Sequence, residues 1–231
     1  MIGLPLISIS RNVNEQTRGD VFAELASYDW IVFSSPNGVR YFFDTFFEKF
    51  DDIRSLGFIR IAAVGKSTAK EISKFYVATD LIPEEANAES LADALVATES
   101  LDSAKVLLVT GNLGRDVLLK KLEEARAIVD RFEVYRTDPT DLSSDPAAKA
   151  FREQGADAIL FTSSSGVKSF VDQAKDLVLS ADAIRPKTVS IGPITSASME
   201  RLGVPRNFQA KEASLDSLVE ELVRNFGKES N

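Results

Sequence analysis

The sequence predicts an α/β protein with two similar, doubly wound parallel-sheet lobes, and three observations support this. Short apolar runs alternate with segments of helical periodicity along most of the chain. Each apolar run is continuous rather than alternating, which is typical of parallel strands that helices cover on both faces. Two strand-to-helix junctions and one helix segment of the first half also recur in the second half.

The first half contains five candidate strands, at residues 31–35, 59–64, 76–82, 105–110 and 128–137. Helices are expected directly after residue 35, from about residue 67, over 88–95 and over about 113–125. The first helix has the clearest signal, because its apolar residues recur at spacings of three and four and form one stripe that we expect in the core. The stripe consists of Val39, Phe42, Phe43, Phe46, Phe47 and Phe50.

The second half has the same order of elements. Strands are expected at 158–162, at 187–191 and near Phe208, with helices between them and a last helix over about 214–226. Residues 137–149 contain two prolines and three aspartates, which is typical of a domain boundary. We therefore expect a linker strand at 1–11, a first lobe at 12–135 and a second lobe at 136–231.

The repeated segments of the two halves are separated by a nearly constant number of sequence positions. FSSPNGV at 33–39 returns as FTSSSGV at 161–167, and GKST at 65–68 returns as GPIT at 192–195. SLADAL at 90–95 returns as SLVEEL at 217–222, so the three offsets are 128, 127 and 127 positions. One such match arises easily by chance, whereas three in the same order indicate two domains of one fold.

Composition excludes several classes of function. The 231 residues are 44% hydrophobic, and no apolar run approaches the ~18 residues of a membrane span or follows the basic segment of an export signal. Cysteine and histidine are absent from the sequence, which removes the thiol nucleophile, the thiolate metal site and the commonest general base. With a net charge of −8 and no basic run, nucleic acid is not an expected partner. We expect a cytoplasmic protein without a metal.

Hydroxyl, glycine and amide residues follow the strands at five junctions of one kind. In open α/β sheets ligands bind at the carboxyl ends of the strands, and the free N–H groups of a helix start favour an anion. Any one junction is ordinarily a helix cap, but five of them favour a large, multiply anionic ligand. GKST is not a nucleotide phosphate loop, because Arg60 stands where that motif has its first glycine. The candidate binding residues are Ser34, Ser35, Asn37, Gly38, Gly65, Lys66, Ser67, Thr68, Gly111, Asn112, Arg115, Thr162, Ser163, Ser164, Gly166, Gly192, Ile194 and Thr195.

Seven stretches together resemble the uroporphyrinogen-III synthase family. They are YDWIVFSSPNGVRYFF, IAAVGKSTA, IPEEANAESLADAL, KVLLVTGNLGRDVLLKKL, VYRT, ILFTSSSGVKSF and SIGPITSASM. The resemblance implies two α/β domains joined by a two-strand linker, with the active site in the cleft between them. It also implies that hydroxymethylbilane, a linear polycarboxylate tetrapyrrole, is cyclised to uroporphyrinogen III with inversion of ring D and loss of water, in haem biosynthesis. The family needs no metal or organic cofactor.

The resemblance also suggests roles for single residues. Tyr135, in VYRT, matches a tyrosine that this family places beside the cleft, where it would give a proton to the departing hydroxyl or orient it. The alternative for Tyr135 is packing between the lobes. Helix-start amides and scattered cations would hold the substrate carboxylates. The candidate cations, each otherwise a solvated surface charge, are Arg40, Lys66, Arg115, Arg136 and Lys168.

The chain departs from the family at its start. Members usually begin with a strand and a helix before the segment that here reads PLISIS at 5–10. The repeat likewise puts the partner of residues 106–136 largely before Met1. We therefore expect the first strand-helix unit of the second lobe to be missing. A misassigned start, a longer fused protein and a compromised variant all stay open.

Two other functions stay open at this point. One is a non-catalytic relative that binds a tetrapyrrole or another anion with an incomplete second domain. The other is an unrelated two-lobe binding protein for a sugar or an amino acid, which would carry an export signal. We expect the chain to be a monomer, unless it is part of a longer fused protein.

Overall fold

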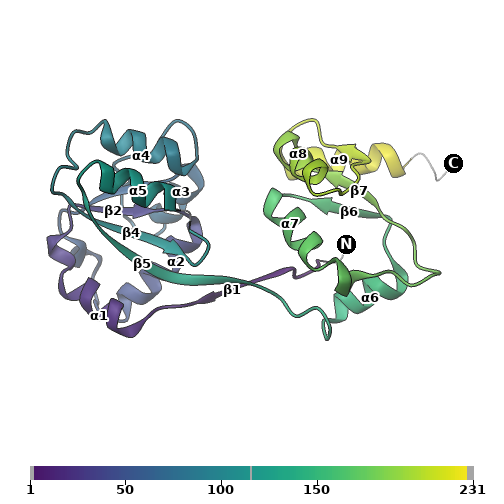
Figure 1. The fold of residues 1–231 in the computed structure, drawn as a ribbon, viewed down its shortest axis with the longest axis horizontal. Helices are drawn as coiled ribbons and strands as arrows, with labels where there is room; N and C mark the ends of the chain where they lie inside the picture. Colours follow the sequence, from purple (N-terminus) through teal and green to yellow (C-terminus); the bar gives the residue numbers. More distant parts are fainter. Residues whose placement is uncertain (1–2, 115, 228–231) are drawn as a thin grey trace. The chain divides into compact units, whose positions relative to one another are not determined.

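The computed structural model describes residues 3–114 and 116–227 of the chain, drawn as a ribbon in Figure 1. The chain divides into two compact units. The larger unit is Ile9–Thr137, and the smaller unit joins Met1–Ser8 to Asp138–Asn231. The chain therefore passes from one unit to the other twice, once within β1 (Ile7–Arg11) and once within β5 (Ile128–Pro139).

The larger unit is built on a five-stranded sheet with the strand order β1-β5-β4-β2-β3. Its other strands are β2 (Trp30–Phe33), β3 (Arg60–Ala63) and β4 (Lys105–Gly111). β2 pairs in parallel with both β3 and β4, and β4 pairs in parallel with β5. Every residue of β2 is buried, as its continuous apolar sequence predicts for a strand that is covered on both faces.

Helices cover both faces of this sheet. Successive residues of a strand point to opposite faces, so Ile31 and Phe33 pack with one set of helices and Trp30 and Val32 with another. The first set is α1 (Glu15–Ala23), α2 (Pro36–Phe47) and α3 (Lys66–Ser73). The second set is α4 (Ala88–Val96) and α5 (Asp116–Glu124). Two short 3-10 turns, η1 (Leu25–Ser27) and η2 (Ile53–Leu56), precede β2 and β3.

Phenylalanines fill the first of these two cores. On α2, Phe42, Phe43 and Phe46 are fully buried, whereas Phe47, which we expected in the same stripe, has 42% of its surface exposed. The ring of Phe22 from α1 meets the rings of Phe42 and Phe46 edge to face, with 6.1 Å between centroids. Each such pair contributes about 0.5–1.5 kcal/mol beyond area burial. The aromatic stripe therefore fixes where α1 and α2 meet.

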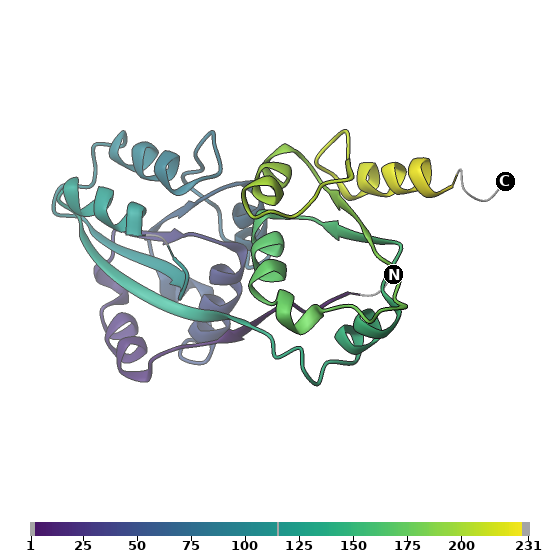
Figure 2. The same ribbon diagram turned by 45° about the vertical axis from the view of Figure 1, so that its right-hand side comes forward.

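The smaller unit has a three-stranded parallel sheet with the order β6-β7-β8, so that β6 is an edge strand (Figure 2). Its apolar residues form three small clusters instead of two large ones. Within the described residues of the chain, no helix is both long and apolar enough to cross a membrane. The elements of this unit are α6 (Pro146–Gln154), β6 (Ala158–Phe161), α7 (Ser164–Asp172), η3 (Ala174–Leu177), β7 (Lys187–Ser190), α8 (Pro193–Arg201), β8 (Phe208–Gln209) and α9 (Leu215–Phe226).

One expectation for the connecting segments was wrong. Residues 76–82 do not form a strand, since only Leu81 makes a bridge, to Ala62, and the Asp80 carboxylate accepts the Ile61 N–H at 2.7 Å. The two units divide between Thr137 and Asp138, within the segment 137–149 where we expected a boundary; β5 runs on to Pro139, and α6 begins at Pro146. The residue before Pro146 is an aspartate that caps α6, so the Asp-Pro pair is a helix start and not a break.

Candidate functional site

A serine begins the helix at the first repeated junction of each unit. Ser35 precedes α2 and Ser163 precedes α7, with backbone angles φ, ψ of −164°, 159° and −161°, 156°. The Ser35 hydroxyl accepts the N–H of Gly38 at 2.9 Å, and the Ser163 hydroxyl accepts the N–H of Gly166 at 3.1 Å. These four predicted site residues therefore make two equivalent helix caps, each of which stabilises its helix by about 0.5–2 kcal/mol.

The predicted residues beside these caps have other partners in the protein. The Ser34 hydroxyl donates to the carbonyl of Val109 at 3.1 Å. The Asn37 side-chain carbonyl accepts a guanidinium N–H of Arg40 at 2.9 Å. In the smaller unit the Ser164 hydroxyl donates to the carbonyl of Ile194 at 3.3 Å, which links α7 to α8, and Thr162 is exposed.

A glycine begins the helix at the second repeated junction. Gly65 precedes α3 and Gly192 precedes α8, both with extended backbone. Among the described residues no side chain accepts an N–H of either first turn. By contrast, α1, α2, α4, α6, α7 and α9 each have a capping side chain. An uncapped first turn keeps its N–H groups for another partner, and the helix dipole favours an anion there.

The two glycine junctions also share one burial pattern. Gly65 and Gly192 are buried, the next two residues are exposed, and a buried threonine follows. A Cβ on Gly65 would lie 2.7 Å from the Cβ of Ala86, and a Cβ on Gly192 would lie 3.3 Å from the Cβ of Ala213. The loops that lead into α4 and α9 thus pass close over these glycines. The exposed pairs are Lys66 with Ser67 and Pro193 with Ile194.

The buried threonines are Thr68 in α3 and Thr195 in α8. The Thr68 hydroxyl has no hydrogen-bond partner anywhere in the described parts of the chain. An unpaired buried hydroxyl costs about 1–3 kcal/mol, and a polar group that reached Thr68 would recover this free energy. The first turn of α3 therefore carries two kinds of unused donor, backbone N–H groups and a buried hydroxyl.

A chain of hydroxyl groups next to α8 was not predicted. Ser190 ends β7, and its Oγ lies 2.7 Å from the Oγ of Ser196. The Ser196 hydroxyl also lies 2.5 Å from the Oε1 of Gln209, to which it donates. A signal for this pair was available, because Ser190 ends a strand and Ser196 directly follows GPIT.

The junction after β4 is arranged around Tyr135. A Cβ on Gly111 would lie 2.4 Å from the Cζ of Tyr135, so only glycine fits beneath the hydroxyl end of that ring. The Asn112 side chain accepts the N–H of Thr137 at 2.9 Å and donates to its carbonyl at 3.1 Å. Asn112 thus holds β5 to the end of β4, which is a structural role. Arg115, which we predicted at this junction, lies outside the described residues.

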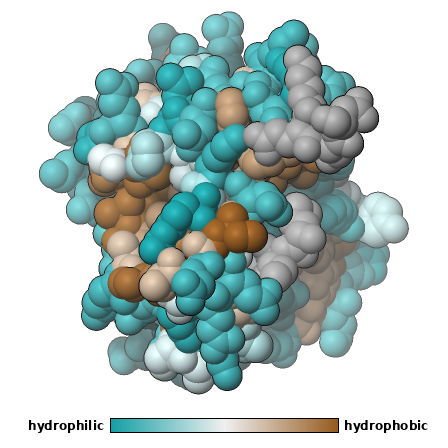
Figure 3. Space-filling model, turned by 90° about the vertical axis from the view of Figure 1, so that its right-hand side faces the viewer, coloured by the Kyte–Doolittle hydropathy of each residue, from teal (hydrophilic) through white to brown (hydrophobic). Residues whose placement is uncertain are grey.

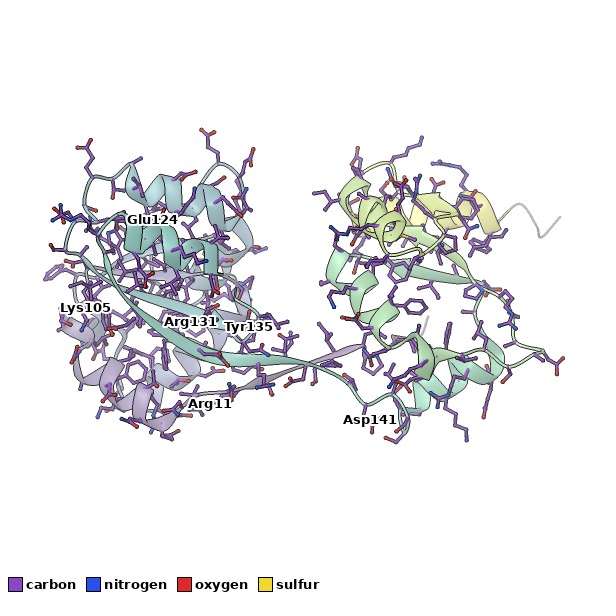
Figure 4. All side chains as sticks on the ribbon, viewed as in Figure 1. Arg11, Lys105, Glu124, Arg131, Tyr135 and Asp141 are labelled. Atoms are coloured by element: carbon purple, nitrogen blue, oxygen red, sulfur yellow. The ribbon has the colours of Figure 1, made fainter. Side chains whose placement is uncertain are left out.

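Tyr135, on β5, is the predicted catalytic residue (Figure 4). It is half-buried, and its hydroxyl oxygen lies 3.1 Å from the Oγ of Ser35. The ring of Tyr41 from α2 stacks on it, with 5.9 Å between centroids and 19° between planes. The Tyr41 hydroxyl donates to the carbonyl of Ile9 at 3.1 Å. Tyr41 was not predicted, because it lies outside the apolar stripe of α2 and no local pattern points to Tyr135 as its partner.

The predicted cations have separate surroundings. Lys66 is exposed at the start of α3, and Arg40 forms an ion pair of 3.4 Å with Glu71. Lys168 forms an ion pair with Asp172 one helical turn away. Within the described residues no three acidic side chains, histidines or cysteines come together as a candidate metal site.

Tyr28, which lies away from these junctions, has a strongly raised pKa. Burial, and then a hydrogen bond of 2.7 Å to Asp130, raise the pKa of Tyr28 well above its usual value. Tyr28 precedes β2 and therefore lies at the amino-terminal edge of the sheet, opposite the carboxyl ends that carry the junctions.

Comparisons with known proteins support one family. The chain matches the family model described as "Uroporphyrinogen-III synthase HemD" over residues 1–220. It is 28% identical over 203 residues to the porphyrin biosynthesis protein HemD of Ruminiclostridium josui, a match that covers 88% of this chain and 39% of that protein. It is 27% identical over 188 residues to the uroporphyrinogen-III synthase of Chlorobaculum parvum, which covers 78% of this chain and 73% of that protein. The chain thus spans well under half of the first relative's length.

The fold is similar to a solved structure as well. The crystal structure of uroporphyrinogen-III synthetase from Helicobacter pylori matches with a TM-score of 0.64 at 18% identity. The match covers 96% of this chain and 92% of the other. At that identity the likeness concerns the α/β fold with its parallel sheet.

Proposed function

The chain belongs to the uroporphyrinogen-III synthase family, cyclising lyases of tetrapyrrole biosynthesis, and on that premise we propose that it converts hydroxymethylbilane to uroporphyrinogen III. The reaction closes the ring with inversion of ring D and releases one water. We take the protein to act as a cytoplasmic monomer, or as part of a longer fused chain, without metal or organic cofactor.

The pair of uncapped glycine junctions carries this proposal. The substrate is a polycarboxylate, and N–H groups of a helix start bind carboxylates without needing a titratable side chain. Gly65 in one unit and Gly192 in the other begin helices whose first turns no described side chain caps. Each is followed by two solvent-exposed residues. We propose that these two helix starts bind substrate carboxylates, with Lys66 adding a positive charge at α3.

Tyr135 is the proposed proton donor. Its O–H gives a proton to the departing hydroxyl, which leaves as water with the electron pair of the C–O bond. Ring closure then releases one proton from the attacked pyrrole carbon. This proton returns to the phenolate, so that Tyr135 is protonated again at the end of the reaction. The residue is half-buried beside the start of α2, whose dipole stabilises the phenolate formed in between. Tyr135→Phe keeps the ring and removes the proton.

The carboxylate site can be tested at the first position of α3. Lys66→Pro removes the backbone N–H of that position, which an α-helix does not use, and α8 already has Pro193 there. Gly65 is extended, as the residue before a proline must be. Lys66→Ala removes the same charge and keeps the N–H, so it is the matched control.

We expect Lys66→Pro to weaken binding of uroporphyrinogen III more than Lys66→Ala, by about tenfold, which corresponds to one charge-assisted hydrogen bond. Titration calorimetry measures the affinity, and the melting temperature should be equal in the two variants. Equal affinities for the two variants would mean that the N–H of Lys66 is not part of the site.

The activity itself is tested with freshly prepared hydroxymethylbilane. A synthase yields mainly the III isomer, whereas spontaneous closure yields the I isomer. A non-catalytic tetrapyrrole binder is the second candidate, and the position of β6 at the edge of the described three-stranded sheet is the observation in its favour. Tight binding of uroporphyrinogen with product I dominant would support that second candidate.

We also propose that the two units are similarly wound, and that the smaller unit lacks one strand and one helix present in the larger. β2 lies between β3 and β4, whereas β6 pairs only with β7 among the described strands. On α4, Ala92 is buried in a cluster with Leu118 and Leu122 of α5. At the same repeat position of α9, Val219 is 54% exposed.

The exposed face of α9 extends this comparison. Leu215 and Val223, one turn to either side of Val219, are 64% and 65% exposed. Figure 3 shows apolar side chains at the surface between polar ones at this end of the molecule. The position that β4 and α5 fill in the larger unit thus has no counterpart among the described residues of the smaller one. We expect a strand that extends β6 and a helix that covers α9 to stabilise the smaller unit.

This part of the proposal is tested by extending the chain at its amino terminus with a strand-helix segment designed on β4 and α5. A higher melting temperature, slower amide exchange in β6 and more III isomer would support it. If β6 already exchanges as slowly as β2 in a monomer with full activity, no unit is missing.

A further inference from the structure

We propose that Tyr41 is a positioning residue for Tyr135, which rests on the catalytic role proposed for Tyr135 above. The two rings are nearly parallel, at 19°, with centroids 5.9 Å apart. Such stacking limits rotation of the Tyr135 ring about the bonds that join it to β5. Tyr41 itself does not touch the proposed path of the proton, since its hydroxyl points to a different acceptor.

The ring of Tyr41 is held from two sides. Its backbone belongs to α2, and its hydroxyl donates to the carbonyl of Ile9 on β1 at 3.1 Å. β1 is the sheet neighbour of β5, which carries Tyr135. Tyr41 thus connects the helix that begins at Ser35 with the strand pair that carries the phenol. A displacement of any of these elements changes where the Tyr135 hydroxyl lies.

Two further contacts fix the hydroxyl end of Tyr135. Gly111 lies directly beneath it, where a Cβ would approach the Cζ to 2.4 Å. The Ser35 Oγ lies 3.1 Å from the phenol oxygen and already accepts the N–H of Gly38. When Ser35 donates its one proton to Tyr135, the phenol proton is left for an acceptor outside the protein, and the phenolate formed later keeps that hydrogen bond. The clamp formed by Tyr41, Gly111 and Ser35 therefore orients Tyr135 as a donor.

The experiment compares two variants at one position. Tyr41→Phe keeps the stacking and loses the hydrogen bond to Ile9, and Tyr41→Ala loses both. We expect Tyr135→Phe to lower kcat for the III isomer about 100-fold, the lower end for general acid catalysis. Tyr41→Ala should lower kcat about tenfold with KM unchanged, and Tyr41→Phe about twofold, because binding contacts are kept while the donor is misplaced.

The double variant separates positioning from a general loss of stability. If Tyr41 acts through Tyr135, adding Tyr41→Ala to Tyr135→Phe lowers kcat no further. Tyr76→Ala is the control, because Tyr76 is 96% exposed and should leave kcat unchanged. Losses that multiply in the double variant would overturn the proposal, since they would mean that Tyr41 acts independently of Tyr135.

A second measurement needs no turnover. With ring-labelled tyrosine, the resonances of Tyr135 are assigned by their loss in Tyr135→Phe. In Tyr41→Ala they should shift, and the ring should flip faster, while Tyr76→Ala leaves them unchanged. An unchanged Tyr135 signal in folded Tyr41→Ala overturns the positioning role. Full activity of Tyr135→Phe would instead overturn the catalytic role proposed for Tyr135. In that case the Tyr135 ring resonances in Tyr41→Ala would still show whether Tyr41 fixes the position of the Tyr135 ring.

Discussion

The junctions at Ser35 and Ser163 have the same backbone angles and the same cap, yet the strands before them differ. All four residues of β2 are buried, whereas three of the four residues of β6 are only half-buried. The capping serine and its partner glycine are set by the local sequence, which is the same at four of the seven positions. Burial of the strand is set by what lies beside it, and β2 has two strand neighbours where β6 has one among those described. The repeat therefore predicts local structure more reliably than core packing.

The largest effect on stability is expected from truncating the side chains of two strand residues at matching repeat positions. Ile31 of β2 is fully buried, and Ile159 is at the same repeat position in β6. Ile31→Ala should lower the free energy of unfolding by about 2–5 kcal/mol, and Ile159→Ala by less than half as much. Urea denaturation of the two variants measures both values. Equal losses would mean that β6 is as well packed as β2.

A smaller effect is expected at the two junction glycines. Gly65→Ala places a Cβ 2.7 Å from Ala86, so the loop before α4 must move, at a cost of about 1–3 kcal/mol. Gly192→Ala places it 3.3 Å from Ala213, and this substitution should be nearly neutral, because a less flexible unfolded chain offsets the contact. Thermal melts of the two variants test this order, and the reverse order would contradict the difference in loop approach.

The serine caps differ in what else each hydroxyl contacts. The Ser35 Oγ lies 3.1 Å from the hydroxyl of the half-buried Tyr135, whereas the Ser163 Oγ lies 3.0 Å from the hydroxyl of the exposed Ser165, whose place water can take. Ser163→Ala should cost about 1 kcal/mol, the usual value for a lost cap. Ser35→Ala should cost about 0.5–1.5 kcal/mol more, because it also removes the hydrogen bond to Tyr135. Repeating both substitutions in the Tyr135→Phe background should make the two costs equal. If the difference persists there, it arises from packing and not from this bond.

The smallest effect is expected on the exposed face of α9. Val219→Ser should change stability by no more than about 0.5 kcal/mol, as is usual for an exposed side chain. Its counterpart Ala92→Ser should cost about 1–3 kcal/mol, because it buries a hydroxyl. Chemical denaturation measures both. A large loss for Val219→Ser would mean that the α9 face is covered in solution, for example by a second molecule.

The sequence predicts well where strands meet helices. Continuous apolar runs gave β2, β4, β6 and β7, because burial on both faces demands them. The sequence did not show that residues 76–82 lack a strand. There the carboxylate of Asp80 accepts the N–H of Ile61 in β3, a hydrogen bond that a strand backbone would otherwise make. The prolines and aspartates of 137–149 mark the segment where the units divide, but their type alone did not show that Asp145 caps α6, since the same residues favour turns and helix caps.

The candidate site was predicted by position more than by role. Hydroxyl groups of Ser34, Ser35 and Ser163 are engaged within the protein, so their chemistry could not be read from residue type. The uncapped state of Gly65 and Gly192 depends on what neighbouring side chains do, which no local pattern states. Tyr41 contacts a residue nearly a hundred positions away, and such a pairing appears only after folding.

The division of the smaller unit into two chain segments bears on the order in which the protein is made and folded. The N–H of Thr140 and the side-chain amide of Gln173 both donate to the carbonyl of Leu6, at 3.2 and 2.6 Å. Leu6 and Gln173 are 167 positions apart, and joining them closes a long loop, whose entropic cost grows only slowly with length. The larger unit is one continuous stretch and can fold as it leaves the ribosome. The segment Met1–Ser8 is made before the larger unit, but it can pack in the smaller unit only after residues 138–231 have been made.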